Sequence, residues 1–185
     1  MRNLVISLAV SLPLLTSVNV SADVVVKMET SAGMIELTLD DASAPITVAN
    51  FVEYAKAGHY DGLVFHRVIP GFMIQGGGMD SSLQPRKTRA PIQNESDNGL
   101  SNRRGSIAMA RTNAPHSATS QFFINTVNNT NLDGSGSRPG YAVFGEVTSG
   151  MDVVDAISAV ETTSVGRFRD VPKQPVLINS VTIAD

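Results

Sequence analysis

Short segments in which apolar and polar residues alternate recur along most of this chain, separated by glycine, proline, asparagine and aspartate. Period-two alternation is typical of β-strands, in which successive side chains point to opposite faces. The chain shows no repeated strand–helix–strand pattern and no internal repeat, so many short strands in one domain favour an antiparallel barrel or sandwich. The predicted strand segments are residues 24–28, 33–39, 64–69, 72–75, 106–110, 120–125, 141–147 and 176–183.

Two further segments have a helical pattern. After Pro45, a residue that suits the first turn of a helix, apolar residues recur three and four positions apart, and Gly58 is placed to end the helix. A shorter pattern of the same kind covers residues 151–157. The first and last strand segments both read as buried, and pairing them would remove two exposed edges. We therefore expect an all-β domain with two helices whose sheet closes on itself.

The N-terminus has the pattern of a secretory signal peptide. Arg2 supplies one positive charge, an apolar run follows it, and Ala22 provides a small residue at the expected cleavage position. A membrane anchor is the alternative, but the run is shorter than the roughly 20 apolar residues that a spanning helix needs. We expect a signal peptide at residues 1–22 and one domain at residues 23–185, with no membrane association after cleavage.

Several kinds of chemistry are disfavoured by the composition. The chain has no cysteine and only three histidines, which stand singly, so disulfides, thiol nucleophiles and a metal site are not expected. Motifs of serine hydrolases and of nucleotide-binding loops are missing, and no cofactor is expected. A formal net charge of −3 argues against a nucleic-acid partner. The basic residues within 86–89 and 103–104 are interpreted as charged side chains of solvent-exposed loops.

Residues 65–77, FHRVIPGFMIQGG, combine a cation, an amide and large apolar side chains. Alternation on both sides of a Pro-Gly bend predicts a hairpin that holds Arg67 and Gln75 on defined faces, with His66 opposite Arg67 in a structural role. Ligand pockets are mostly apolar with a few placed polar groups, and this composition fits one. Taken alone, however, the stretch favours an ordinary hairpin in which Arg67 is solvated and the Phe and Met side chains belong to the core.

Five ordered motifs extend this local interpretation. FHRVIPGFMIQGG is followed by GSIAMAR, SQFFIN, LDG and YAVFGEV, which together span nearly the whole chain after the signal peptide. In this order they resemble the cyclophilin family of peptidyl-prolyl cis-trans isomerases, in particular the exported forms of Gram-negative bacteria. The resemblance implies a closed eight-stranded antiparallel β-barrel capped by two helices, with the substrate groove on its outer face. It also implies a periplasmic location.

The resemblance assigns roles to individual residues. It makes Arg67 the catalytic arginine, which would donate a hydrogen bond to the imide nitrogen of an X-Pro bond without a covalent step, and it places Gln75 beside it. The residues implied to bind substrate are Phe72, Met73, Ala110, Arg111, Gln121, Phe123, Leu132 and Tyr141. Simple alternation puts Phe72 opposite Met73, and the Pro-Gly bend is the expected reason that both reach the groove.

The implied partners are proline-containing polypeptides, in the form of exported proteins that are unfolded or still folding. Nothing in the sequence points to a large exposed apolar face, so a monomer is expected. A proline-peptide binding module or chaperone with incidental turnover is the alternative function, although the retained Arg67 favours an enzyme. The sequence leaves open the client proteins and any role of the loop from Met79 to Arg104 in selecting them.

Two positions depart from the pattern of the best-studied eukaryotic cyclophilins. Asn131 stands where those proteins have a tryptophan, and Tyr141 stands where they have a groove histidine. The tryptophan is associated with tight cyclosporin binding, because it supplies an indole donor and a large apolar surface. Weak cyclosporin binding is therefore expected, whereas Tyr141 keeps a ring with a polar tip and need not impair substrate binding.

Overall fold

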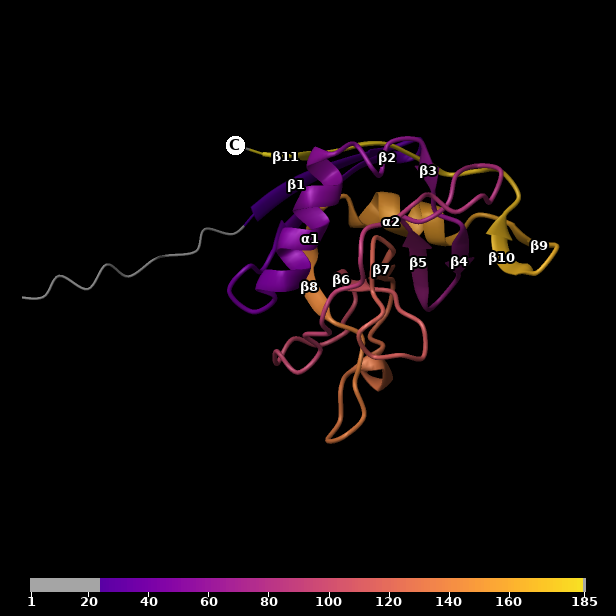
Figure 1. The fold of residues 1–185 in the computed structure, drawn as a ribbon. Coiled ribbons are helices and arrows are strands. Elements are labelled where there is room, and N and C mark those ends of the chain that lie inside the picture. Colours follow the sequence, from indigo (N-terminus) through magenta and orange to yellow (C-terminus); the bar gives the residue numbers. More distant parts are fainter. Residues whose placement is uncertain (1–23, 185) are drawn as a thin grey trace, which may run out of the picture.

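Eleven strands and two α-helices make up residues 24–184, the part of the chain that this computed structural model describes (Figure 1). The first elements are β1 (Val24–Thr30), β2 (Gly33–Leu39), α1 (Pro45–Lys56), β3 (Leu63–Val64), β4 (Arg67–Ile69) and β5 (Met73–Gly76). After a long connection follow β6 (Ser106–Met109), β7 (Phe122–Asn125), the 3-10 helix η1 (Thr130–Leu132), β8 (Val143–Ser149), α2 (Met151–Ser158), β9 (Thr162–Val165), β10 (Phe168–Pro172) and β11 (Leu177–Ile183). The expected signal peptide lies outside the described residues. No helix within residues 24–184 is long and apolar enough to cross a membrane.

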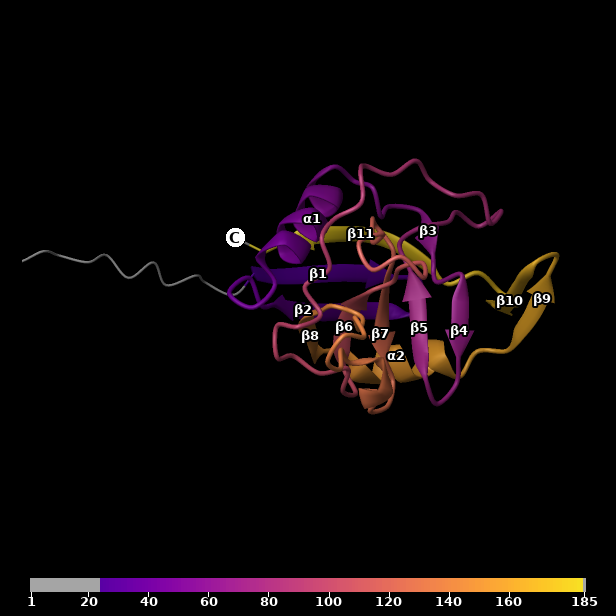
Figure 2. The ribbon, with the colours of Figure 1, turned by 60° about the horizontal axis from the view of Figure 1, so that its bottom comes forward.

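Nine of these strands form one antiparallel sheet whose two edges are joined by the chain itself. The strand order is β3-β11-β1-β2-β8-β6-β7-β5-β4, and only Phe65 and His66 separate the two end strands, β3 and β4, in the sequence. These end strands are therefore two halves of one interrupted strand, and the curled sheet closes as an eight-stranded barrel. Figure 2 shows the sheet turning from β1 and β2 round to β5 and β4. The predicted barrel is thus confirmed.

The first and last strands of the described chain lie side by side. β11 pairs with β1 from Val26↔Ile183 to Thr30↔Ile178, and β1 pairs with β2 on its other edge. Val26 and Met28 are fully buried, whereas their strand neighbours Val25, Lys27 and Glu29 are exposed. The alternation that predicted this strand therefore reflects one face in the barrel interior and one in solvent. Pairing of the terminal strands leaves no free edge there, as expected.

The helices pack on the barrel, α1 against β11 and α2 against β2, β4 and β5. Pro45 occupies the first turn of α1, and Gly58 follows its end with a φ of 64°, as the sequence predicted. Phe51 of α1 is fully buried, and its ring stacks on Tyr60 with the centroids 5.0 Å apart. The edge of Phe122 from β7 completes this aromatic core at 5.7 Å from Phe51.

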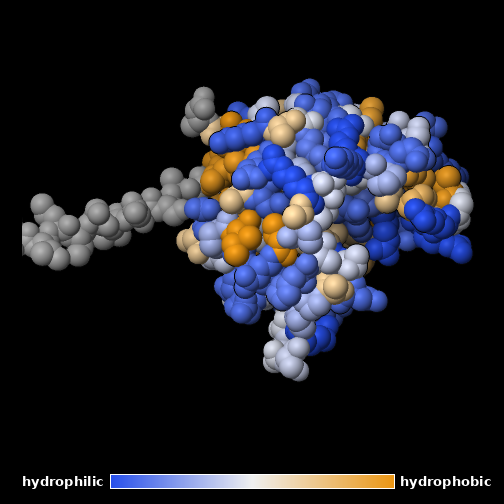
Figure 3. Space-filling model, viewed as in Figure 1, coloured by the Kyte–Doolittle hydropathy of each residue, from blue (hydrophilic) through white to orange (hydrophobic). Residues whose placement is uncertain are grey.

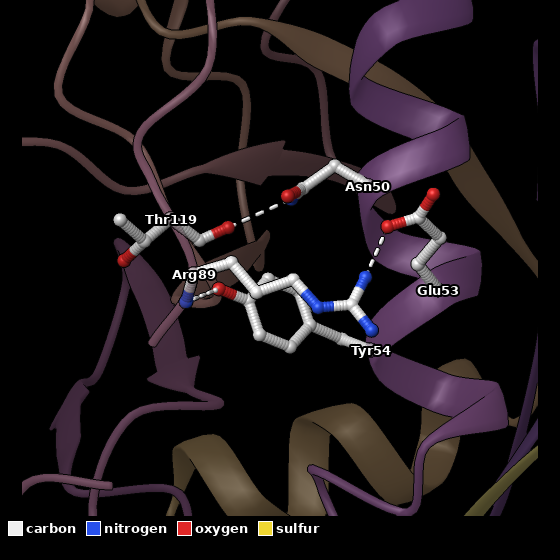
Figure 4. Close-up of polar contacts among 5 residues, drawn as sticks. All are labelled: Asn50, Glu53, Tyr54, Arg89 and Thr119. Atoms are coloured by element: carbon white, nitrogen blue, oxygen red, sulfur yellow. Dashed lines mark hydrogen bonds and ion pairs between the residues drawn. The ribbon is translucent and has the colours of Figure 1, made fainter. Parts of the chain in front are cut away.

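The long connection between β5 and β6 is fastened to α1 by polar contacts (Figure 4). The backbone N–H of Arg89 donates to the Tyr54 hydroxyl at 2.8 Å, and the Arg89 guanidinium pairs with Glu53. Asn50 of the same helix donates from its side chain at 2.7 Å to the carbonyl of Thr119, which belongs to the separate loop between β6 and β7. This predicted surface loop therefore follows a defined path over the helix instead of standing free in solvent.

Two structured segments were not predicted. Residues 162–172 form the hairpin of β9 and β10, and η1 lies within residues 128–140, which were expected to be loop. Three of the four residues of β9 are exposed, so no apolar alternation marked it. The segment predicted as one strand at 64–69 is interrupted at its centre, and Phe72 lies in the turn before β5. The other strand boundaries agree with the prediction to within two residues, and β2 matches it at both ends.

Strand β7 divides the core into two parts. Phe122 is fully buried and points into the barrel interior, whereas its neighbour Phe123 is 4 % exposed and points outward. The prediction that the two rings lie on opposite faces is confirmed. Phe123 joins Met73, Ala108 and Val143 in a separate apolar cluster on the outer face, here called the outer cluster. The face of the molecule seen in Figure 3 is largely hydrophilic, with scattered apolar spots.

Candidate active site

A groove over the outer cluster gathers nine of the ten site residues expected from the sequence. It encloses about 210 Å³ and is lined by Arg67, Phe72, Met73, Gln75, Ala110, Arg111, Phe123, Leu132 and Tyr141. The tenth residue, Gln121, lies beside the groove, where its side-chain oxygen accepts a hydrogen bond from Gln75 Nε2 at 3.0 Å. The geometry is that of a ligand pocket, with an apolar floor and a few polar groups at the rim.

The hairpin of β4 and β5 supplies one wall of the groove. Its register places Arg67 directly opposite Gln75, so a cation and an amide stand side by side at the rim. Gly71 turns the chain between the strands with a φ of 69°, a left-handed conformation that glycine adopts without strain. Because Phe72 lies in this turn and not in β5, strand alternation does not apply to it, and it lines the groove next to Met73.

Two adjacent glycines, Gly77 and Gly78, allow the chain beyond Gln75 to lie close to the residues that lead into β7. A Cβ atom on Gly78 would come within 2.4 Å of Gln121 Cγ. A Cβ atom on Gly77, whose φ is 82°, would come within 2.8 Å of the Ser120 carbonyl oxygen. This glycine run therefore serves the close approach of two backbone segments, which sets the position of Gln121 at the groove.

The opposite wall is built from Arg111 and Tyr141. The guanidinium carbon of Arg111 lies 4.6 Å from the centre of the Tyr141 ring, a cation–π arrangement. The same guanidinium donates to the carbonyl oxygens of Pro139 at 2.7 Å and Gly140 at 3.0 Å. The Tyr141 ring in turn packs edge-on against Phe123, with the centroids 5.7 Å apart. The Arg111 side chain is thus occupied in holding this wall, and Arg67 is the cation left to meet a ligand.

The Arg67 side chain is 43 % exposed and has one ion pair, in which its Nε lies 3.6 Å from Asp170 Oδ2 of β10. Among the described residues, no hydrogen bond occupies its two terminal nitrogens. These N–H groups can therefore donate to a molecule in the groove. Asp170 was not singled out from the sequence, because its contact with Arg67 depends on the unpredicted β9–β10 hairpin.

Comparison with known proteins agrees with the fold. The family model described as cyclophilin type peptidyl-prolyl cis-trans isomerase/CLD matches residues 25–183. The chain belongs to the cyclophilin family. Similar proteins include some whose names contain peptidyl-prolyl cis-trans isomerase, and a solved structure with this fold.

Peptidyl-prolyl cis-trans isomerase cyp18 from Streptomyces antibioticus is 58 % identical over 161 residues, which cover 85 % of this chain and 97 % of that protein. Peptidyl-prolyl cis-trans isomerase B from Escherichia coli is 52 % identical over 163 residues, 86 % of this chain and 99 % of that protein. A cyclophilin-type isomerase from Cryptosporidium parvum shares the fold, with a TM-score of 0.74 at 23 % identity over 89 % of this chain and 99 % of that chain. This cyclophilin is accordingly a peptidyl-prolyl cis-trans isomerase.

Below the groove of this cyclophilin lies a network of polar side chains that sequence reasoning missed. The Asp133 carboxylate accepts hydrogen bonds from the backbone and side-chain nitrogens of Asn102 at 2.7 and 2.8 Å. Asn102 accepts from Asn125, and Asn129 donates to Asn125 at 2.7 Å and to the Phe72 carbonyl at 2.8 Å. Burial alone would raise the pKa of Asp133, but the hydrogen bonds it accepts hold that pKa below its usual value. The network fixes the turn that carries Phe72.

A larger cavity, of about 490 Å³, opens between residues 99–104 and strands β2 and β8. Carboxylates such as Asp40 and Glu146 share its lining with the guanidinium of Arg104, which donates two hydrogen bonds to Asp155. The cavity lining lacks the large apolar side chains, such as Phe72, Met73 and Phe123, that form the floor of the groove. No cluster of three or more His, Asp or Glu residues within residues 24–184 could hold a metal ion. The groove is therefore the candidate active site.

Gly78 offers a test of how closely Gln121 must be held. In Gly78→Ala, the new Cβ overlaps a flexible side chain, so we expect Gln121 to move and the Gln75–Gln121 hydrogen bond to break. We predict a fall in kcat/KM of about fivefold, near the ~1 kcal/mol of one hydrogen bond, with a melting temperature almost unchanged. Gly77→Ala is the contrast, since its Cβ meets backbone at positive φ and should lower the melting temperature strongly. Equal effects of the two changes would contradict this interpretation.

His66 predicts a pH dependence of stability. It is 6 % exposed, and burial, aided by the neighbouring Arg67 charge, lowers its pKa to about 4. Because the unfolded histidine has a pKa near ~6.5, the unfolded chain binds more protons between these values, and stability is lost as pH falls through this window. We expect urea unfolding to show up to about 3 kcal/mol lost between pH 6.5 and 4. The loss should shrink in His66→Gln but persist in the control His116→Gln, since His116 is exposed.

Proposed function

We propose that this cyclophilin rotates X-Pro bonds of proline-containing polypeptides by a non-covalent mechanism in the groove. The observation that supports this most directly is the pairing of an apolar floor with a partly exposed Arg67 whose terminal nitrogens are unoccupied. The floor and one side offer contacts to a proline ring from Phe72, Met73, Phe123 and Leu132. A structure of the Cryptosporidium parvum relative, at 23 % identity, was obtained in the presence of the dipeptide Ala-Pro, which supports a proline-peptide substrate.

Arg67 is the proposed source of transition-state stabilisation. Rotation about the X-Pro bond breaks amide resonance, which underlies the ~18–20 kcal/mol barrier of peptide bonds. The twisted imide nitrogen regains a lone pair, and an Arg67 N–H donates a hydrogen bond to it. This bond is nearly absent with the planar ground state, so it lowers the barrier instead of merely tightening binding. One such charged hydrogen bond contributes about 1.5–3 kcal/mol.

The remaining acceleration comes from holding the peptide and excluding water. Gln75, oriented by Gln121, binds the peptide backbone at one rim, and backbone groups at Ala110 and Arg111 bind it at the other. The proline ring on the apolar floor removes the imide from water, where hydration favours the planar form. Tyr141 closes the groove beside Phe123.

We further propose that the enzyme acts as a monomer in the periplasm on exported proteins whose folding is limited by X-Pro isomerisation. Uncatalysed isomerisation takes tens to hundreds of seconds, which is slow enough to limit folding. The charge at Arg2, the apolar run and the small residue Ala22 support export. Fractionation of producing cells should place a protein beginning at Asp23 in the periplasm. Recovery of the uncleaved chain in the cytoplasm alone would contradict the proposal.

The alternative, a proline-peptide binding module, uses the same groove but would need a different ratio of protein to client to affect refolding. An isomerase accelerates proline-limited refolding of a client at far less than one enzyme per client. A binding module alters refolding only near equimolar concentration and slows it as readily as it speeds it. A refolding series from 1:100 to 1:1 enzyme to client, roughly spanning catalytic and stoichiometric regimes, therefore separates the two.

Cyclosporin binding is expected to be weak. Asn131 is exposed, and its backbone carbonyl accepts a hydrogen bond from Arg138 at 3.2 Å, so it adds little apolar surface to the groove. An inhibition constant in the micromolar range or weaker is therefore expected in a peptide isomerisation assay. Asn131→Trp should tighten inhibition about tenfold or more, since an indole adds area and a donor. Nanomolar inhibition of the unchanged enzyme would refute the expectation.

A further inference from the structure

We propose that Asp170 is a positioning residue, which orients the Arg67 guanidinium so that its terminal nitrogens face the substrate. This inference rests on the role of Arg67 proposed above. Asp170 Oδ2 lies 3.6 Å from Arg67 Nε, and within residues 24–184 no hydrogen bond or ion pair engages the two terminal nitrogens. The separation is that of an ion pair without a short hydrogen bond. The carboxylate therefore attracts one edge of the guanidinium and leaves the other edge free to donate.

A bulge in the β9–β10 hairpin changes the direction of the Asp170 side chain relative to a regular strand. Phe168 pairs with Val165 and Val171 pairs with Thr163, so β10 has one residue more than β9 between these pairs. Such a β-bulge re-aims a side chain relative to regular alternation. Asp170 has a φ of 57°, a left-handed conformation that is uncommon outside glycine. A backbone outlier kept at this point is typical of functional sites, where the surrounding structure maintains it.

The hairpin lies against the strand that carries Arg67. β10 packs on β4, and both views show the β9–β10 hairpin beside β4 at one side of the barrel (Figures 1 and 2). No other described strand brings a carboxylate into an ion pair with Arg67. The β9–β10 hairpin lies outside the barrel sheet, and it supplies the ion-pair partner of Arg67.

The contribution of the pair is orientation more than stability. Both side chains are about two-fifths exposed, at 43 % for Arg67 and 40 % for Asp170, and ion pairs of this exposure stabilise folded proteins little. A flexible arginine, however, loses rotamer freedom when it donates to a substrate. Prior restriction by Asp170 reduces that loss at the transition state. The effect should therefore appear in kcat and not in the melting temperature.

The decisive variant is Asp170→Asn, because asparagine tolerates the same left-handed backbone and keeps the side-chain shape without the charge. We expect kcat to fall about threefold to fivefold, with KM for a proline tetrapeptide and the melting temperature unchanged. The order parameter of the Arg67 Nε–H bond, measured by ¹⁵N relaxation, should fall. At about 1 M salt, where charges are screened within ~3 Å, the kcat of the unchanged enzyme should approach that of the variant.

The matched control is Glu161→Gln, which removes the Lys173–Glu161 pair at the base of the same hairpin. This change should leave kcat and the order parameter of Arg67 Nε–H unchanged.

Each outcome bears on one proposal. If Asp170→Asn keeps full kcat while Arg67→Ala shows the expected loss of activity, Asp170 has no positioning role, and the role of Arg67 stands. A lower kcat without any change in the Arg67 Nε signal also overturns the positioning role, because it indicates a structural effect elsewhere. Full activity of Arg67→Ala overturns the proposed mechanism itself. In an Arg67→Ala background, Asp170→Asn should cause no further loss.

Discussion

Replacement of Arg67 by alanine is expected to lower kcat/KM for a proline-containing peptide roughly 10- to 100-fold, which corresponds to the loss of one charged hydrogen bond of about 1.5–3 kcal/mol. The fold should be intact, because the side chain is 43 % exposed and its ion pair with Asp170 is of the kind that adds at most about 1 kcal/mol. Circular dichroism and the melting temperature should therefore stay close to those of the unchanged protein. A chymotrypsin-coupled peptide assay and proline-limited refolding measure the activity.

The matched control for this change is Arg104→Ala. Arg104 is also a surface arginine in an ion pair, with its side chain 45 % exposed, but it lies outside the groove. Its removal should leave kcat/KM unchanged. Arg67→Lys is expected to retain only part of the activity, since an ammonium lacks the planar array of donors. Undiminished catalysis of proline-limited refolding by Arg67→Ala would remove Arg67 from the mechanism.

The adjacent residues Phe122 and Phe123 should separate stability from catalysis. Phe122 is fully buried in the barrel interior, where it contacts the aromatic core, so Phe122→Ala is expected to cost about 3–5 kcal/mol of unfolding free energy. Catalysis per folded molecule should change little. Phe123→Ala should cost less stability, because the outer cluster is small, but it removes the floor of the groove.

For Phe123→Ala we expect a fall in kcat/KM of about 10- to 100-fold, because a proline ring loses apolar contacts of about 1.5–3 kcal/mol. The loss should appear mainly as a higher KM, in contrast to the effect of Arg67→Ala on kcat. Urea unfolding and peptide kinetics at a temperature where both variants stay folded provide the comparison. The assignment of the two faces of β7 would be wrong if Phe122→Ala lost activity and Phe123→Ala did not.

Much of the barrel was accessible from the sequence because its signals are local. Alternation in β1 and β2 reports one face in the interior and one in solvent, and Pro45 and Gly58 mark the limits of a helix through their own backbone preferences. Phe122 and Phe123 were assigned to opposite faces for the same reason. Where a side chain left the alternation, as Phe72 did in its turn, the Pro-Gly bend gave the clue.

The motifs named residues that the fold brings together along one groove, but they did not indicate the contacts that hold those residues. Nothing local to Asn102, Asn125 and Asn129 indicates that their amides form one network with Asp133 beneath the groove. Buried amides need partners, and in this network they come from separate segments of the chain that only the folded barrel brings together.

The sequence by itself determined that the chain forms a strand-rich barrel with two helices, and its motifs named Arg67, Gln75 and apolar residues that line one groove in the fold. Tertiary structure alone decided that the interrupted strand at Phe65 and His66 joins the sheet edges, and that Asp170 meets Arg67 from a hairpin about a hundred residues away in the chain. The reason is physical: periodicity and turn chemistry act between near neighbours, whereas an ion pair depends on where two distant backbones pass each other.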